Sequence, residues 1–178
     1  MQRLPMNKII ALVIAPGEFR DEEYIEPKTL FEQHGARTVT ISTTLEPVTG
    51  MLGATVQATL LLKDAQADNF DAVVFVGGMG ARRLYHEPEA LRLARQAVAH
   101  NKVVGAICLA PNILAQAGVL KNRRATAWAF EVPAAEAVNQ VGESVVRDGR
   151  IITANGPQAA TPFAQAIAEL LLAAPTPQ

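Results

Sequence analysis

Short apolar segments separated by polar or glycine-containing stretches are the main pattern along the chain. Residues 9–15 form a continuous apolar run, which is typical of a strand covered on both faces of a parallel sheet. Residues 37–43 alternate and are rich in β-branched side chains, which also favours a strand. Two further buried strands are predicted at residues 71–76 and 102–107.

Helical patterns fill the intervals between these strands. A charged stretch at residues 18–23 leads into a helical segment that stops at Gly35, and Pro88 opens a second helix. A third helix is predicted from Cys108 to Gly118. The last helix carries an apolar stripe of residues spaced three to four apart: Phe163, Ile167, Leu170 and Leu171.

The remaining segments predict smaller features. Residues 47–62 contain Gly50 and Gly53 and resemble a hairpin excursion, and residues 124–128 predict a short strand. Residues 145–147 and 151–154 predict a hairpin with a type I′ turn at Asp148-Gly149. Residues 173–178 form a proline-rich tail that we expect to be frayed.

Strands that alternate with helices predict an α/β fold with a mostly parallel central sheet and helices on both faces. The chain shows neither an internal repeat nor a linker, so we expect residues 1–178 to form a single domain. In such sheets ligands bind outside the carboxyl ends of the strands. Three segments occupy such ends: the acidic run after the first strand, the glycines after Val76, and Cys108.

Composition narrows the functional classes. The net charge of −1 provides no general attraction for nucleic acid or an anionic membrane, and no apolar run approaches the ~20 residues of a membrane-spanning helix. The first residues lack the pattern of a secretory signal. A single cysteine forms no internal disulfide and suits a reducing compartment, so the expected location is cytoplasmic.

Cys108 stands at a sharp strand-to-helix turn. Ala106 and Ala110 occupy the two positions at which the nucleophile elbow of α/β hydrolases requires small residues. Placement at the start of a helix predicts a lowered thiol pKa. A lone cysteine at a strand end is more often an inert core residue, but the small neighbours and the helix start favour the reactive interpretation.

The glycines after Val76 offer a second chemical feature. Glycine allows a backbone N–H to approach a substrate oxygen closely, so the N–H groups of Gly78 and Leu109 form a candidate oxyanion site. A tight turn before a helix explains the glycines equally well. A dinucleotide site is the weakest alternative, because residues 77–83 do not match the required glycine spacing.

These motifs together resemble the ThiJ/PfpI superfamily of DJ-one-like proteins. The resemblance extends from Lys8 to about Leu172 and rests on the segments 23–27, 76–78, 106–111, 118–120 and 155–157. It implies a flavodoxin-like fold of the class I glutamine-amidotransferase-like type, commonly dimeric, with Cys108 as nucleophile or oxidisable thiolate. It also implies that Glu23 stays protonated and donates a hydrogen bond to the sulfur. The alternative for Glu23 is a solvated charge favouring a helix start, an interpretation that fits its neighbours Asp21 and Glu22 better than Glu23 itself.

The histidines depart from the superfamily pattern. Leu109 stands where peptidase-like members carry a histidine, and Trp128 lies where other members place one. His34 and His100 fall at the ends of predicted helices, where they suit the helix dipole, and His86 is expected on the surface. No cluster has metal-ligand spacing, so we expect neither a metal nor a cofactor.

Three functional hypotheses follow. The first is a cysteine-dependent enzyme for small reactive carbonyl compounds, of the glyoxalase or deglycase type, with Cys108 and Glu23 as catalytic residues. In this hypothesis Gly78 and Leu109 bind the oxyanion, and Gly77, Trp128 and Asn155 line the pocket. The second is a redox-sensing or protective protein with an oxidisable Cys108, and the least favoured is a peptidase or amidase. The expected partners are a small-molecule substrate and a second copy of the chain.

Overall fold

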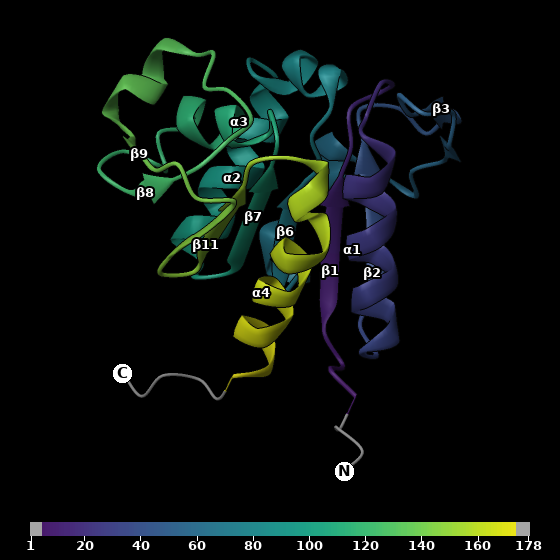
Figure 1. Cartoon of the computed structure of the whole chain (residues 1–178). Helices are drawn as coiled ribbons and strands as arrows, with labels where there is room; N and C mark the ends of the chain where they lie inside the picture. Colours follow the sequence, from purple (N-terminus) through teal and green to yellow (C-terminus); the bar gives the residue numbers. More distant parts are fainter. Residues whose placement is uncertain (1–4, 174–178) are drawn as a thin grey trace.

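The centre of the molecule is a seven-stranded sheet, which we describe, like all that follows, for residues 5–173 of a computed structural model (Figure 1). Every neighbouring pair in the sheet is parallel except the edge pair β10–β11. The strand order is β10 (Val145–Asp148), β11 (Ile151–Ala154), β7 (Val103–Ile107), β6 (Ala72–Phe75), β1 (Ile9–Val13), β2 (Arg37–Ser42) and β5 (Leu60–Leu61).

Helices cover both faces of this sheet (Figure 1). Helices α1 (Asp21–Gln33) and α4 (Ala160–Leu172) pack against each other on one face, and α2 (Pro88–Ala99) and α3 (Pro111–Gln116) cover the other. Gly105 of β7 shows how closely α4 approaches: a Cβ there would lie 2.9 Å from the ring of Phe163. The predicted α/β fold, with a mostly parallel sheet between helices, is confirmed.

Burial explains the composition of the central strands. The side chains of β1, β6 and β7 are almost completely buried because each strand has a neighbour on both edges and helices on both faces. Strand β2 lies nearer the sheet edge and starts at an exposed residue, Arg37, which matches its more polar sequence. A continuous apolar pattern therefore indicates a central strand of this sheet, and an alternating pattern indicates a strand nearer its edge.

Two short pairs of strands and five 3-10 helices complete the fold. Strands β3 (Val48–Thr49) and β4 (Thr55–Val56) form an antiparallel hairpin, and β8 (Arg124–Ala125) pairs with β9 (Asn139–Gln140). The 3-10 helices are Leu62–Asp64, Ala67–Asn69, Met79–Leu84, Pro133–Ala137 and Pro157–Ala159.

Three sequence predictions need correction. Within residues 47–62, only the first part is a hairpin, since β5 continues from it into the main sheet. The short strand predicted at 124–128 covers only Arg124–Ala125 and belongs to a separate two-stranded pair. The β10–β11 turn has a positive φ at Gly149 but not at Arg150, whereas type I′ requires both.

The tail predicted to fray, residues 173–178, lies outside the described residues except for Ala173. No helix in the described part of the chain has the length and apolar character needed to cross a membrane.

The topology brings the carboxyl ends of β1, β6 and β7 to one edge of the sheet. Strand β1 lies next to β6, and β6 lies next to β7, all three running in the same direction. The chain leaves β1 toward β2 on one side and later returns to β6 on the other, which makes this edge a topological switch point. The three segments that follow these strands carry Glu23, Gly77 and Cys108.

Candidate active site

Cys108 occupies a strained turn between β7 and α3. Its φ is +65°, in a region that residues with a side chain rarely adopt. Two backbone hydrogen bonds hold it: its N–H donates to the Ala154 carbonyl at 2.9 Å, and its carbonyl accepts from Trp128 N–H at 2.7 Å. A conformation of this cost persists only where the surroundings enforce it, and here it places the sulfur outside the end of β7.

The residues beside Cys108 are small and buried, as the elbow geometry requires. Ala106 and Ala110 are completely buried, and Pro111 begins α3, where its missing N–H leaves no bond unmade. Helix α3 has only six residues and starts three positions after Cys108. Its dipole is therefore a weaker influence on the thiol than the sequence suggested.

Glu23 approaches the cysteine from the first turn of α1. Its side chain is fully buried, and its Oε2 accepts a hydrogen bond from Gly77 N–H at 3.1 Å. Its Oε1 has no hydrogen-bond partner among the described residues. Of the two interpretations drawn from the sequence, the solvated helix-start charge does not fit this position.

Gly77 lies between the carboxyl group and the cysteine. A Cβ on Gly77 would collide with Glu23 Oε2 and the Ile107 carbonyl oxygen, and would come within 2.6 Å of Cys108 Cβ. Any larger residue would therefore separate the two groups. The absence of a side chain at position 77 allows Glu23 and Cys108 to share one site.

Burial dominates the ionisation of Glu23. Desolvation raises the pKa of Glu23 from its ordinary value of 4.5 to about 7. Interactions with the Cys108 side chain, with Gly77 N–H and with the positive charge of Arg20 oppose that shift. The carboxyl group thus changes its charge near neutral pH, the range in which a general base is most effective.

The thiol shows the opposite of the trend expected from the sequence. Burial, followed by the negative charge of Glu23, raises the pKa of Cys108 from 9.0 to about 12, while N–H groups of Gly78 and Leu109 lower it. The expected depression by a helix start is wrong because Cys108 is only 8% exposed and desolvation outweighs those two donors. Burial and the negative charge of Glu23 both favour the thiol form of Cys108 over the thiolate.

The two N–H groups remain well placed for a developing negative charge. Gly78 adopts a φ of +102°, and a Cβ there would collide with the backbone of residues 18–20. The same backbone fixes the strand end, since Arg20 N–H donates to the Gly77 carbonyl at 2.9 Å. Both donors act on the Cys108 sulfur, so an oxygen bound next to it would lie within their reach.

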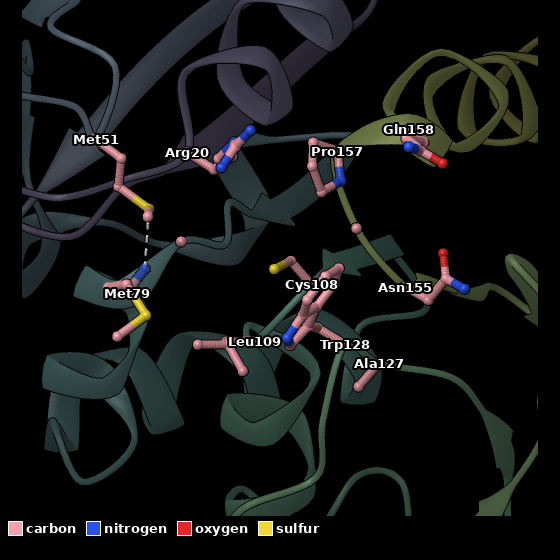
Figure 2. Close-up of a pocket in the computed structure, with 12 residues that line it drawn as sticks. Arg20, Met51, Met79, Cys108, Leu109, Ala127, Trp128, Asn155, Pro157 and Gln158 are labelled. Carbon is pink, nitrogen blue, oxygen red and sulfur yellow. Dashed lines mark hydrogen bonds between the residues drawn. The ribbon is translucent and has the colours of Figure 1, made fainter.

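A cavity of about 710 Å³ opens above the sulfur (Figure 2). Cys108, Gly78 and Leu109 form its base. Its rim carries one charged side chain, two thioethers, one indole and two amides, from Arg20, Met51, Met79, Trp128, Asn155 and Gln158. A cavity of this size accommodates a small metabolite with groups beyond the reacting atoms.

Most residues predicted for the site thus come together, although not all in the predicted place. Trp128 and Asn155 line the cavity, but Gly77 lies behind the sulfur and is not part of the wall. Trp128 is 68% exposed, so it borders the opening and does not fill it. His86 is exposed and does not line the cavity.

Several contributors were not predicted from the sequence. Arg20 Nε and Nη2 form a two-pronged ion pair with Glu22 at 2.8 and 3.1 Å. Asp21, which the sequence suggested to be a solvated charge, is buried and accepts hydrogen bonds from the N–H groups of Leu52 and Ala54. It thereby holds the β3–β4 hairpin, which carries Met51 to the rim. The Asp21 contacts join segments about thirty residues apart, so local sequence gave no signal of them.

Asn112 is a further residue that sequence analysis missed. It is fully buried, and its Nδ2 donates to the carbonyls of Leu109 and Ala129 at 3.0 and 2.8 Å. Its Oδ1 accepts from the N–H groups of Glu131 and Val132. Asn112 therefore holds the segment after Trp128 through three hydrogen bonds and the cysteine turn, at Leu109, through one.

No group of three or more potential metal ligands occurs among residues 5–173. The described residues bring to the cavity or its base a thiol, a buried carboxyl group, backbone N–H donors and polar side chains.

Comparison with known proteins agrees with this architecture. Residues 8–170 match the sequence profile of the DJ-1/PfpI family. A protein of unknown function from Methanocaldococcus jannaschii is 38% identical over 166 residues, covering 88% of this chain and 79% of its own length. Deglycase PfpI from Pyrococcus furiosus is 33% identical over 117 residues, covering 66% of this chain and 70% of its own.

A third relative, the glutathione-independent glyoxalase DJR-1.2 of Caenorhabditis elegans, is 29% identical over 90% of this chain and 88% of its own. Among solved structures, a ThiJ/PfpI domain protein from Brachyspira murdochii superposes with a TM-score of 0.86 at 34% identity. The superposition covers 93% of this chain and 96% of that one. The fold is thus shared over most of both chains.

Proposed function

Since the chain belongs to the DJ-1/PfpI family, we propose that it is a cysteine-dependent enzyme acting on small reactive carbonyl compounds. The substrate class comes from two directions. Relatives about 30% identical carry the names deglycase and glyoxalase. Independently, the cavity combines a nucleophile, a buried base and a pair of oxyanion donors, which is the equipment needed for addition to a carbonyl carbon.

The first chemical step follows from the order of the two pKa values. Above pH 7, ionised Glu23 removes the Cys108 proton while the sulfur forms a bond to the carbonyl carbon. The C=O π electrons move onto the oxygen, where the N–H groups of Gly78 and Leu109 stabilise the charge. Glu23 then returns its proton to that oxygen, which gives a neutral hemithioacetal and leaves the carboxylate as it began.

The observation that carries this proposal is the position of Glu23. Burying a carboxyl group with one unpaired oxygen lowers the stability of a fold. Its presence here therefore favours a functional role for Glu23. Only Gly77 separates it from Cys108, and its pKa of about 7 matches a base that works near neutrality.

A paired assay tests the proposal. Consumption of methylglyoxal and cleavage of a peptide amide are measured for the unchanged protein and for Cys108→Ser. We expect methylglyoxal loss that depends on Cys108 and no peptide cleavage, because amide hydrolysis needs an acid to protonate the leaving amine and Leu109 replaces the histidine that could supply it. Peptide cleavage that depends on Cys108 would instead establish a peptidase.

The alternative function is redox sensing through oxidation of Cys108. Oxidation by peroxide proceeds through the thiolate, and a pKa raised by burial keeps the thiolate scarce. This is why we rank the sensor second. Inactivity on both assay substrates, together with rapid conversion of Cys108 to the sulfinate by hydrogen peroxide in mass spectrometry, would reverse the ranking.

We also propose that the chain assembles as a homodimer or larger homo-oligomer, an inference that rests on the family alone. Static light scattering at micromolar concentration tests it. A mass near 38 kDa or above supports assembly, since one chain has a mass of 19.0 kDa; a mass of one chain contradicts it.

A further inference from the structure

The cavity wall has an uneven distribution of charge. Among the described residues that line it, Arg20 is the only one with a charged side chain, and no carboxylate faces the space. The nearest acidic group at the base, Glu23, lies behind the sulfur and is completely buried. A substrate entering the cavity therefore meets a positive charge and two side-chain amides.

The ion pair with Glu22 orients this charge without cancelling it inside the cavity. Glu22 occupies Arg20 Nε and Nη2, while Nη1 has no hydrogen-bond partner among residues 5–173. Arg20 lines the cavity and Glu22 does not, so the positive end of the pair faces the substrate. The bidentate contact also restricts the guanidinium to one orientation, which lowers the entropic cost of binding an anion.

Arg20 is also close enough to the reacting atoms to matter. The hydrogen bond to Glu22 is the main cause of the raised pKa of Arg20, and the charges of Glu23 and Cys108 add smaller contributions. In Figure 2, Arg20 and Asn155 lie on different sides of the cavity with Cys108 between them. The amide of Asn155 and that of Gln158 make no hydrogen bonds to other described residues and can donate to a second acceptor oxygen.

Size supplies an independent argument. About 710 Å³ is far more than the reacting carbonyl of a two- or three-carbon aldehyde needs. The remaining space is bordered by the guanidinium and the amides, whose hydrogen bonds are best satisfied by carboxylate oxygens.

We propose that the substrate of this site is an aldehyde or ketone that carries a carboxylate group, and that Arg20 selects it. The inference rests on the proposed function and specifies its substrate class. The carboxylate binds Arg20 Nη1 while the carbonyl carbon lies against the Cys108 sulfur. Arg20 acts on binding, so its loss raises KM for a charged substrate and leaves kcat nearly unchanged.

Turnover offers one test, with an isosteric pair of substrates. Glyoxylate and methylglyoxal have the same heavy-atom skeleton, but only glyoxylate is anionic. For Arg20→Gln we expect KM for glyoxylate to rise about tenfold and KM for methylglyoxal to change by less than about twofold, as one charge in a partly solvated cleft predicts. Arg20→Lys should retain much of the preference, and 0.5 M salt should weaken it.

Alkylation of Cys108 tests the same selection without any turnover. Rates with anionic iodoacetate and neutral iodoacetamide are measured at one pH, and their ratio is divided by that of the urea-unfolded chain. We expect a normalised ratio of about five to ten for the unchanged protein and about one for Arg20→Gln. The matched control is Arg83→Gln, which removes an exposed arginine paired with Glu18 outside the cavity and should leave the ratio unchanged.

The two tests separate two failures. If no aldehyde is consumed, the proposed enzyme is wrong, yet the alkylation ratio still reports whether Arg20 selects anions. If the ratio is near one in the unchanged protein, or if Arg20→Gln and Arg83→Gln lower it equally, the selection by Arg20 is refuted even for an active enzyme. Circular dichroism of each variant excludes loss of fold as the cause.

Discussion

The base and the rim of the cavity are built in contrasting ways. At the base, in which we now include the two residues behind the sulfur, Glu23, Gly77 and Cys108 are buried and closely packed, and each shapes the chemistry of the others. At the rim, Met51, Met79 and Trp128 expose much of their side chains and Arg20 is partly exposed. Backbone hydrogen bonds hold Arg20, Met51 and Trp128 in place. The base has no freedom to vary without loss of chemistry, whereas the rim can vary and change what binds.

Backbone anchoring is what allows the rim to be exposed and still ordered. Trp128 N–H donates to the Cys108 carbonyl, and Asn112 holds the segment that follows. Asp21 holds the hairpin that bears Met51. The exposed indole of Trp128 contributes little to the core and borders the opening of the cavity.

Loss of the nucleophile should give the largest difference between base and rim. Cys108→Ser should lower kcat for carbonyl consumption by at least about a thousandfold, because a serine hydroxyl beside Glu23 is a much poorer nucleophile. Trp128→Ala should raise KM a few-fold and leave kcat within about twofold. Steady-state kinetics on the two variants measure both, and a similar fall in kcat for each would erase the distinction.

Glu23 should make the free energy of unfolding depend on pH. Its pKa is raised in the folded chain, so the folded state binds a proton more tightly than the unfolded state does. The stabilisation that protonated Glu23 gives to the folded state is fully present below about pH 4.5 and is lost as pH rises through 7. The free energy of unfolding should therefore decrease by about 3 kcal/mol over this range. Urea titrations between pH 4.5 and 8 on the unchanged protein and Glu23→Gln measure it.

The Glu23→Gln variant supplies the reference for that measurement, since other groups titrate in both proteins. The difference in the free energy of unfolding between the two should change by about 3 kcal/mol over this range. A difference that stays constant with pH would show that Glu23 has an ordinary pKa. It would then contradict the role of Glu23 as the general base.

Two glycine substitutions compare the tightness of base and rim directly. Gly77→Ala forces a Cβ against Glu23, Ile107 and Cys108, and should lower the free energy of unfolding by about 2 kcal/mol or more. Gly156→Ala places a Cβ 3.0 Å from the exposed Trp128 indole, which can shift, so the cost should stay below about 0.5 kcal/mol. Equal costs in denaturant titrations would contradict the contrast.

The smallest effect is expected for the stability of Trp128→Ala. Because 68% of the Trp128 surface is exposed, the indole buries little apolar area. The substitution should therefore lower the free energy of unfolding, measured by thermal unfolding, by no more than about 0.5 kcal/mol. A much larger loss would make Trp128 a structural residue and weaken its assignment to the rim.

The sequence was informative about the base, whereas at the rim it indicated only Trp128 and Asn155. Continuous apolar runs predicted β1, β6 and β7, and strands of this kind bring Glu23, Gly77 and Cys108 to one edge by topology alone. Arg20 and Asp21 resemble part of a charged helix start in the sequence. The distant partners of Asp21, and the cavity that Arg20 lines, are set by the fold. The sign of the Cys108 pKa shift was also out of reach, since it depends on burial.

The central claim is that the base holds a protonated thiol beside an ionisable Glu23, and the pH dependence of Cys108 alkylation tests it most directly. Rates with iodoacetamide are measured from pH 5 to 11 for the unchanged protein and for Glu23→Gln. The account predicts a midpoint above the ordinary value of about 8.5 in the unchanged protein and a lower midpoint in the variant, because removing the Glu23 charge removes one cause of the raised thiol pKa. A midpoint near 7 in the unchanged protein that disappears in Glu23→Gln would contradict it, since the proton would then remain on Glu23 and the sulfur would carry the charge.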